Sequence, residues 1–172
     1  MNSGPHSIRE ALADDAAALS ELAVRSKGYW GYSPDFLEAC RAELTVDPQR
    51  IGTPDFQCFV AHAGDTLLGY YALETVSDGV YELEALFVEP TQIGSGVGRS
   101  LMRHALAVLR SLSAVRLVIQ GDPNAHDFYI AMGARHTGAR ESASVPGREL
   151  PLFEIEIDAE CWSTGGDRQK RS

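Results

Sequence analysis

A glycine-rich segment that leads into a long amphipathic helix most constrains the fold of this chain. Three glycines alternate with other residues in Gly94-Ser95-Gly96-Val97-Gly98, five residues after a largely apolar run at residues 83–88. Alternating glycines allow successive backbone N–H groups to turn toward one point, and a helix N-terminus adds about half a positive charge. The segment therefore predicts an anion site. The alternative is a tight strand-to-helix turn that needs positive φ angles.

Two common phosphate-binding motifs do not match this segment. A Walker P-loop requires Gly-Lys-Ser/Thr after Gly and four residues, and neither Gly94 nor Gly96 begins such a sequence. The dinucleotide motif GxGxxG requires a third glycine where this chain has Arg99, and it follows the first strand of its domain. ATP or GTP hydrolysis and NAD or FAD binding are therefore disfavoured.

The remaining pattern predicts one α/β (α+β) domain. Turn signals at Ala63-Gly64-Asp65 and Ser77-Asp78-Gly79 separate three antiparallel strands, and the later order strand, helix, strand indicates a βαβ unit. We expect a mixed, mostly antiparallel sheet of six to seven strands with about four flanking helices. The expected strands are residues 7–11, 56–61, 67–75, 81–88, 115–119, 134–140 and 150–157. The expected helices follow Asp14 or Asp15, Ser33-Pro34, Gly96 and Asp122-Pro123.

Length and charge limit the function. The 172 residues fit a single domain, which we place at residues 6–158 between disordered tails at residues 1–5 and 159–172. The formal net charge of −9 repels polyphosphate and anionic lipid, so nucleic acid and membranes are disfavoured partners. No secretory signal or membrane span is visible, and the three cysteines, Cys40, Cys58 and Cys161, lie far apart. We expect a cytoplasmic, metal-free protein with free thiols. A homodimer is compatible with these features.

Residues 82–134 resemble the acetyl-CoA-binding core of the GNAT-family N-acetyltransferases. The resemblance is carried by Leu86-Phe87-Val88-x-Pro90, by the glycine segment and by Asn124-Ala125-x-x-Phe128-Tyr129-x-x-Met132-Gly133-Ala134. It implies that the strand residues bind the pantetheine arm of the cofactor, and that the loop residues bind its pyrophosphate. The implied pantetheine residues are Leu86, Phe87 and Val88. The implied pyrophosphate residues are Gly94, Ser95, Gly96, Val97, Gly98 and Arg99. The family usually has Arg or Gln where this chain has Ile93, with Gln92 one place early.

Acyl transfer to an amine needs a base, because a lysine-like amine loses its proton at pH 7 at a cost of about 4.6 kcal/mol. Strand alternation predicts that Glu82 and Glu84 share one face with Leu86 and Val88. The resemblance implies that Glu84 or Glu82 is this base, and crowding of the two charges is expected to raise one pKa. A solvated outer face is the alternative interpretation.

The departing thiolate gains from an acid, and the resemblance implies Tyr129 for that role; the alternative is a core aromatic beside Phe128. Asn124 either binds the pantetheine arm or caps its helix. The aromatic loop residues Tyr29, Trp30 and Tyr32 either line an acceptor pocket, where they could hold a cation, or pack between two helices.

The sequence hypothesis is therefore an acetyl-CoA-dependent N-acetyltransferase that acts on a primary amine of a small molecule or peptide. The amine attacks directly in a ternary complex, and a strand amide near Val88 polarises the thioester carbonyl. Two alternatives remain open at this point. One is a non-catalytic acyl-CoA-binding sensor or interaction module on the same scaffold, and the other is a ping-pong route through Cys58.

Overall fold

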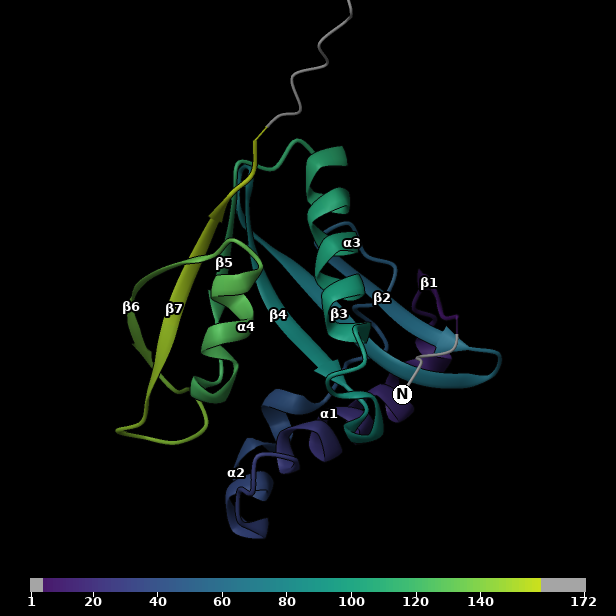
Figure 1. The fold of residues 1–172 in the computed structure, drawn as a ribbon, viewed down its shortest axis with the longest axis vertical. Helices are drawn as coiled ribbons and strands as arrows, with labels where there is room; N and C mark the ends of the chain where they lie inside the picture. Colours follow the sequence, from purple (N-terminus) through teal and green to yellow (C-terminus); the bar gives the residue numbers. More distant parts are fainter. Residues whose placement is uncertain (1–4, 159–172) are drawn as a thin grey trace, which may run out of the picture.

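A computed structural model describes residues 5–158, and within this range seven strands form one sheet (Figure 1). The spatial order is β1-β2-β3-β4-β5-β7-β6, and only β4 and β5 pair in parallel. This confirms the predicted mixed, mostly antiparallel sheet. The tails expected at residues 1–5 and 159–172 lie, apart from Pro5, outside the described residues. The strands are β1 (Ser7–Glu10), β2 (Phe56–Ala63), β3 (Thr66–Ser77), β4 (Val80–Val88), β5 (Arg116–Gln120), β6 (Arg135–Glu141) and β7 (Glu149–Glu156).

Four α-helices flank the sheet in the described part of the chain. They are α1 (Ala16–Gly28), α2 (Pro34–Leu44), α3 (Val97–Ser111) and α4 (His126–Ala131). Helix α2 begins as predicted, because the Ser33 hydroxyl accepts a hydrogen bond from the Phe36 amide at 3.2 Å. Asp15 directly precedes α1, but its carboxylate accepts from the Leu12 amide and pairs with Arg9, each at 2.8 Å. The predicted side-chain cap of α1 is therefore absent from the described structure.

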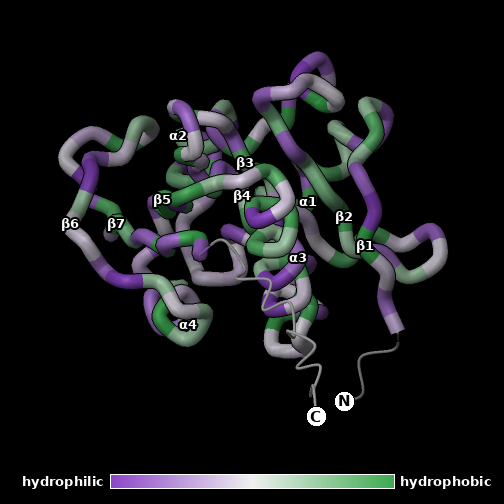
Figure 2. The backbone as a smooth tube through the Cα atoms, turned by 90° about the horizontal axis from the view of Figure 1, so that it is seen from above, coloured by the Kyte–Doolittle hydropathy of each residue, from purple (hydrophilic) through white to green (hydrophobic). Residues whose placement is uncertain are grey.

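The two faces of the sheet bury separate hydrophobic cores. Helix α3 places Leu101, Met102 and Ala105 in the core on one face, and Tyr129 of α4 joins that core. Helices α1 and α2 cover the opposite face with Leu19, Leu22 and Leu44, among others. In contrast to these apolar cores, β6 at the edge of the sheet is largely hydrophilic (Figure 2), and all its residues are exposed. The cores therefore fix the central strands, β2 to β5, between two layers of helices.

Strands β4 and β5 pair only over Val80–Leu83 and Arg116–Ile119, and they then diverge (Figure 1). Beyond Leu83, β4 remains paired with β3 on one side, while its other edge faces a gap. The divergence opens the middle of the sheet at the carboxyl end of β4, immediately before the glycine segment. A ligand can reach backbone N–H and C=O groups there that a complete sheet would occupy.

A β-bulge at Glu84 breaks the alternation of β4. Ala85 pairs with Ala72 of β3, but Leu83 pairs with Leu73, so Glu84 is an extra residue. The prediction that Glu82 and Glu84 share a face with Leu86 and Val88 is therefore wrong. Tyr81, Leu83, Leu86 and Val88 pack into the core beneath α3 and α4. Ala85 and Phe87 pack toward α1 and α2, and Glu84 reaches Arg50 on that same side.

Candidate functional site

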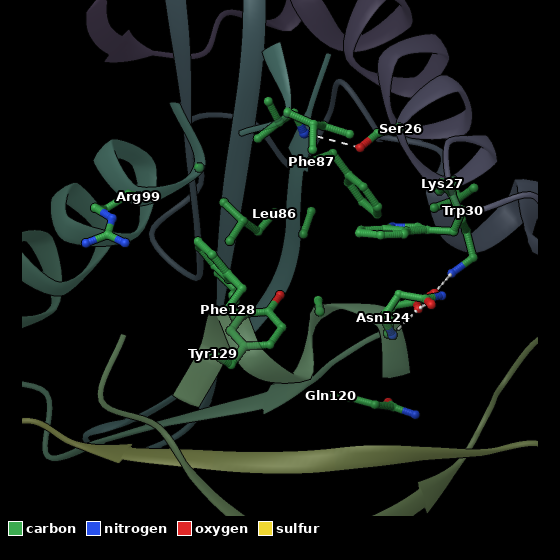
Figure 3. Close-up of a pocket in the computed structure, with 18 of the residues that line it drawn as sticks. Ser26, Lys27, Trp30, Leu86, Phe87, Arg99, Gln120, Asn124, Phe128 and Tyr129 are labelled. Carbon is green, nitrogen blue, oxygen red and sulfur yellow. Dashed lines mark hydrogen bonds and ion pairs between the residues drawn. The ribbon is translucent and has the colours of Figure 1, made fainter. Parts of the chain in front are cut away.

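A cavity of about 440 Å³ lies where β4 and β5 diverge (Figure 3). Its lining comes from both helix layers, from residues 83–88 of β4 and from the glycine segment. Leu86, Phe87 and Phe128 provide an apolar middle, and polar side chains of α1, α2 and the β5–α4 connection surround one end. The cavity therefore joins the predicted anion site to a charged end that lies between α1, α2 and the β5–α4 connection.

The glycine segment forms an open turn at one end of the cavity. Gly94 and Gly96 have φ angles of +83° and +98°, and a Cβ atom at either position would meet nothing within 4 Å. Helix α3 begins directly after Gly96, so its first N–H groups have no partner within the helix. The positive φ angles confirm the interpretation of a tight strand-to-helix turn, and the open backbone and the helix dipole at this turn suit an anion such as a pyrophosphate.

The predicted loop residues divide into two groups. Gly94, Gly96, Gly98 and Arg99 line the cavity, together with Gln92 and Ile93. Val97 is buried in the core instead, and the Ser95 hydroxyl donates to the Gln92 carbonyl at 2.6 Å. These last two residues shape the turn from within.

The open edge of β4 provides backbone donors. The Glu89 amide donates to the Leu68 carbonyl of β3 at 2.8 Å, so alternation directs the amides of Leu86 and Val88 toward the gap. The Val88 amide there donates to the Ser26 hydroxyl at 3.3 Å. Ser26 is a buried residue of α1 that the sequence interpretation missed. Its signal was a polar side chain within the apolar series Leu19, Leu22 and Ala23 at helical spacing.

Tyr129 packs as a core aromatic beside Phe128, as the alternative interpretation predicted. Its ring packs against Phe128 and Phe153, with centroid distances of 5.3 and 5.4 Å. A Cβ atom at position 121 would lie 2.8 Å from this ring, so Gly121 is required by the packing. The hydroxyl points into the cavity (Figure 3) and has no hydrogen-bond partner among residues 5–158. Burial, and secondarily the charge of Asp122, raises the pKa of Tyr129, which keeps the hydroxyl protonated.

The two candidate bases have different surroundings. Glu84 lines the cavity and accepts hydrogen bonds from Arg50 at 2.9 and 3.5 Å, whereas Glu82 pairs with Arg140 at 3.0 Å. Burial alone would raise the pKa of Glu84, but hydrogen bonds with Glu74 and Arg50 outweigh it and lower this pKa. Of the carboxylates near the bulge, Glu74 of β3 has the raised pKa, at about 7, because of its hydrogen bond to Glu84 and its burial.

Asp122 organises the charged end of the cavity. It accepts hydrogen bonds from the Tyr32 hydroxyl at 2.8 Å and from the Asn124 side chain at 2.8 Å, and it pairs with Lys27 at 3.4 Å. Arg148, before β7, donates to the Tyr32 hydroxyl at 2.7 Å. Hydrogen bonds and the charge of Lys27 lower the pKa of Asp122 although burial opposes this. We call Lys27, Tyr32, Asp122, Asn124 and Arg148 the Asp122 network.

The Asp122 network bears on the predictions for Asn124 and for the three loop aromatics. Asp122 also accepts from the Asn124 amide at 2.9 Å and so caps the short turn, which makes the alternative that Asn124 is the cap wrong. The Asn124 side chain lines the cavity. Trp30 lines it too, with its ring near Phe87 in Figure 3, while Tyr29 is exposed and meets the edge of Trp30 at 5.0 Å. Tyr32 stacks on Phe36 within the network.

Other sequence expectations concern cysteines, metals and membranes. Cys58 is buried in the core beneath α1 and α2, and burial raises the pKa of its thiol to about 12, which argues against a nucleophile. Cys40 is a buried free thiol, and Cys161 lies outside the described residues. Across residues 5–158, the structure has no cluster of three or more His, Cys, Asp or Glu side chains suited to a metal ion. The helices described within this range are too short or too polar to cross a bilayer.

Comparison with known proteins gives one consistent result. The family model described as the acetyltransferase (GNAT) family matches residues 17–134. An aminoglycoside N(6')-acetyltransferase type 1 of Stenotrophomonas maltophilia is 31% identical over 154 residues, covering 84% of this chain and 93% of its own. The peptidyl-lysine N-acetyltransferase YjaB of Escherichia coli is 30% identical over 151 residues, covering 87% and 95%. The PaiA N-acetyltransferase of Thermoplasma acidophilum, solved with coenzyme A, shares the fold, with a TM-score of 0.73, 19% identity and coverage of 89% and 99%.

Proposed function

The chain belongs to the acetyltransferase (GNAT) family and is an acyltransferase, and we propose that it transfers an acetyl group from acetyl-CoA to a primary amine of a small molecule or peptide. One observation carries this proposal. A single cavity is lined by the open glycine turn, the unpaired edge of β4 and Glu84, and the Tyr129 hydroxyl points into it (Figure 3). A donor and an acceptor can therefore meet between its two ends.

The glycine end of the cavity is the proposed binding site for acetyl-CoA. We assign the backbone of residues 94–99 to the pyrophosphate, because the turn is open and the helix dipole is positive there. The edge of β4 at residues 86–88 is assigned to the pantetheine arm, with Asn124 on the opposite wall. Acetyl-CoA supplies the activated thioester. The Val88 amide, which donates to the Ser26 hydroxyl in this structure, exchanges that partner for the thioester carbonyl in order to polarise it.

The proposed reaction uses Glu84 as the base and Tyr129 as the acid, with the Val88 amide at the thioester carbonyl. Glu84, ionised beside Arg50, accepts the proton of the acceptor ammonium, whose removal at pH 7 costs roughly 4.6 kcal/mol. The amine nitrogen forms a bond to the carbonyl carbon, and the carbon–sulfur bond breaks. Tyr129 is the proposed acid for the departing sulfur: burial keeps its hydroxyl protonated, and the hydroxyl stabilises the developing thiolate by donating a hydrogen bond to it, while the thiol takes up its proton from solvent. Glu82, held by Arg140, is the weaker candidate base.

The acceptor is proposed as a cationic amine. The two curated relatives act, by their names, on an aminoglycoside and on peptidyl lysine, so the family resemblance leaves both small molecules and peptides open. Glu43, Glu84 and Trp30 line the cavity, and Lys27 at the same end is already paired with Asp122, so this lining supports a cationic acceptor, in agreement with the net charge of −9. A cytoplasmic location is part of the proposal, supported by the free thiols of Cys40 and Cys58.

Two measurements test the proposed function. Isothermal titration with acetyl-CoA is expected to give a Kd below about 1 mM, and a panel of amines and lysine peptides is expected to release the CoA thiol. Absence of acetyl-CoA binding would refute the proposal. Binding without thiol release from any amine would instead support the non-catalytic acyl-CoA-binding module. The Tyr129→Phe variant separates the steps, because turnover is expected to fall while acetyl-CoA affinity is retained.

A further inference from the structure

We propose that Glu74, a residue of β3 outside the cavity lining, takes over the proton that Glu84 removes from the acceptor, and that Arg50 positions the two carboxylates for this transfer. The inference rests on the proposed function, because it requires Glu84 to be the base. It extends that function by giving the proton a route out of the cavity.

Arg50 joins the two carboxylates directly. Its Nη1 lies 2.9 Å from Oε1 of Glu84, and its Nη2 lies 2.8 Å from Oε1 of Glu74. The guanidinium also stacks over the ring of Phe56, 4.3 Å from the ring centre, which restrains its plane. A planar group with fixed donors thus holds both acids on one side of the sheet.

The bulge explains why these two carboxylates meet. Glu74 lies directly opposite Glu82 in the register of β3 and β4. Glu82 is drawn away to Arg140 of β6 at 3.0 Å, while the extra residue of the bulge, Glu84, shares Arg50 with Glu74. The carboxylate pair is therefore a product of strand register and of two arginines, one for each glutamate of β4.

The difference in solvent exposure between the two carboxylates gives the proton transfer a direction. The Glu74 side chain is 45% exposed and that of Glu84 is 35% exposed, and only Glu84 lines the cavity within the described residues. Glu84 therefore faces the acceptor, and Glu74 offers the more open contact with bulk water. A proton that moves from Glu84 to Glu74 has moved from the reaction site toward solvent.

The charged groups around Glu74 and Glu84 determine the pH range in which this pair can transfer a proton. Arg50 supplies one positive charge to both carboxylates, so the second ionisation is opposed, and the pair titrates as a unit. The pKa of Glu74 is raised to about 7, and that of Glu84 is lowered. The other charged or titratable groups that act on the pair are Glu82 of β4, Asp47 beside Arg50, and Tyr70 of β3.

The step itself is a proton transfer with no other change. An O–H bond on Glu84 breaks, an O–H bond on Glu74 forms, and Glu74 then releases the proton to water. The route needs Glu74 in its ionised form. Below about pH 7 Glu74 already carries a proton, so turnover is expected to rise as pH increases through that value.

The test is the pH dependence of kcat, measured with saturating acetyl-CoA and with the best amine of the panel. The wild type is expected to show an ascending limb near pH 7. Glu74→Gln should move this limb down by about one pH unit or more and lower the plateau about fivefold, with the KM for acetyl-CoA unchanged. Arg50→Gln should move the limb upward, because both carboxylates lose their counter-charge.

Matched controls come from α2, where Arg41 pairs with Glu38 at 2.9 Å and Glu21 at 3.7 Å. Glu38→Gln and Arg41→Gln remove the same charges from an exposed pair and should leave the profile unchanged. Carboxyl ¹³C NMR of wild type and Glu74→Gln provides a readout without turnover, and a step near pH 7 should be present only in the wild type.

The results of these experiments distinguish failure of the proton route from failure of the proposed acetyltransferase function. Amine acetylation with the same pH profile in Glu74→Gln and wild type would overturn the inference alone. Absence of the NMR step in the wild type would also overturn it. Failure of every amine to release thiol would refute the proposed function, and the proton route with it.

Discussion

The two ends of the cavity are built in different ways. The glycine end uses the backbone of consecutive residues 94–99, whereas the charged end uses side chains from α1, α2, β4 and the connections that hold Arg50, Asp122 and Arg148. A backbone site can be recognised in one short segment of sequence, because glycine and a helix start determine it. A side-chain site depends on contacts between distant segments. The two ends should therefore respond differently to substitution.

The largest expected contrast comes from Glu84→Gln. Loss of the base should lower kcat by about 10²- to 10⁴-fold, and the Kd for acetyl-CoA should stay unchanged because the glycine end is intact. Stopped assays of thiol release and calorimetry measure the two quantities. Glu154→Gln on β7, which weakens pairs with Arg116 and Arg135 at 3.8 and 3.9 Å, is the control. A parallel loss of acetyl-CoA affinity in Glu84→Gln would contradict the separation of the two ends.

A smaller effect is expected for Asp122→Ala. The variant leaves Lys27 and Arg148, with side chains 11% and 20% exposed, without their shared counter-charge. The free energy of unfolding should fall by about 2–4 kcal/mol at pH 7, and the KM for the amine should rise. Urea unfolding and amine kinetics measure these effects. Asp127→Ala, at a fully exposed residue of α4, removes the same charge as a control.

The difference in the free energy of unfolding between wild type and Asp122→Ala should also decrease at acidic pH. Because the pKa of Asp122 is lowered in the folded protein, its contribution is present above the unfolded pKa of about 3.9 and is lost as pH falls below it. The difference between wild type and Asp122→Ala should therefore be constant from about pH 6 to 8 and shrink below about pH 4. A difference that grows on acidification would contradict the assignment.

The smallest effect is expected at the glycine end. Gly96→Ala places a Cβ atom in a left-handed conformation that costs about 1–2 kcal/mol, and it points a methyl group into open space beside the proposed pyrophosphate. The Kd for acetyl-CoA should rise about tenfold, measured by calorimetry. Gly133→Ala, at φ +94° and equally open, carries the same strain at the end of α4 and should leave the Kd unchanged. Equal losses in both variants would show that only strain matters.

The fold was largely predictable because its signals are local. Ser33-Pro34 starts α2, and Gly64 and Gly79 occupy turns with positive φ. In α3, Val97, Leu101, Ala105 and Leu109 recur at helical spacing and are buried. The parallel pairing of β4 and β5 followed from the helix between them. The resemblance to a family added the assignment of the glycine segment to acetyl-CoA.

The charged end was less predictable for physical reasons. Alternation cannot reveal a bulge, so the face assigned to Glu82 and Glu84 was misplaced relative to Leu86 and Val88. Arg50 follows α2 by several residues, and no local pattern connects it with Glu84, 34 positions later. Tyr32 was predicted either to line an acceptor pocket or to pack between two helices, and no local pattern indicated that Asp122 and Arg148, both distant in sequence, hydrogen-bond its hydroxyl.

The bulge has a consequence for how such a chain can change over evolution. Glu84 has no partner in the β3–β4 ladder. Leu83 and Ala85 already pair with the consecutive residues Leu73 and Ala72, so removal of Glu84 would make them neighbours without changing their pairing. Loss of one codon would therefore delete the proposed base while every apolar residue of β4 kept its core. Under the proposed mechanism, a single in-frame deletion would thus remove the base and leave the proposed acetyl-CoA site intact.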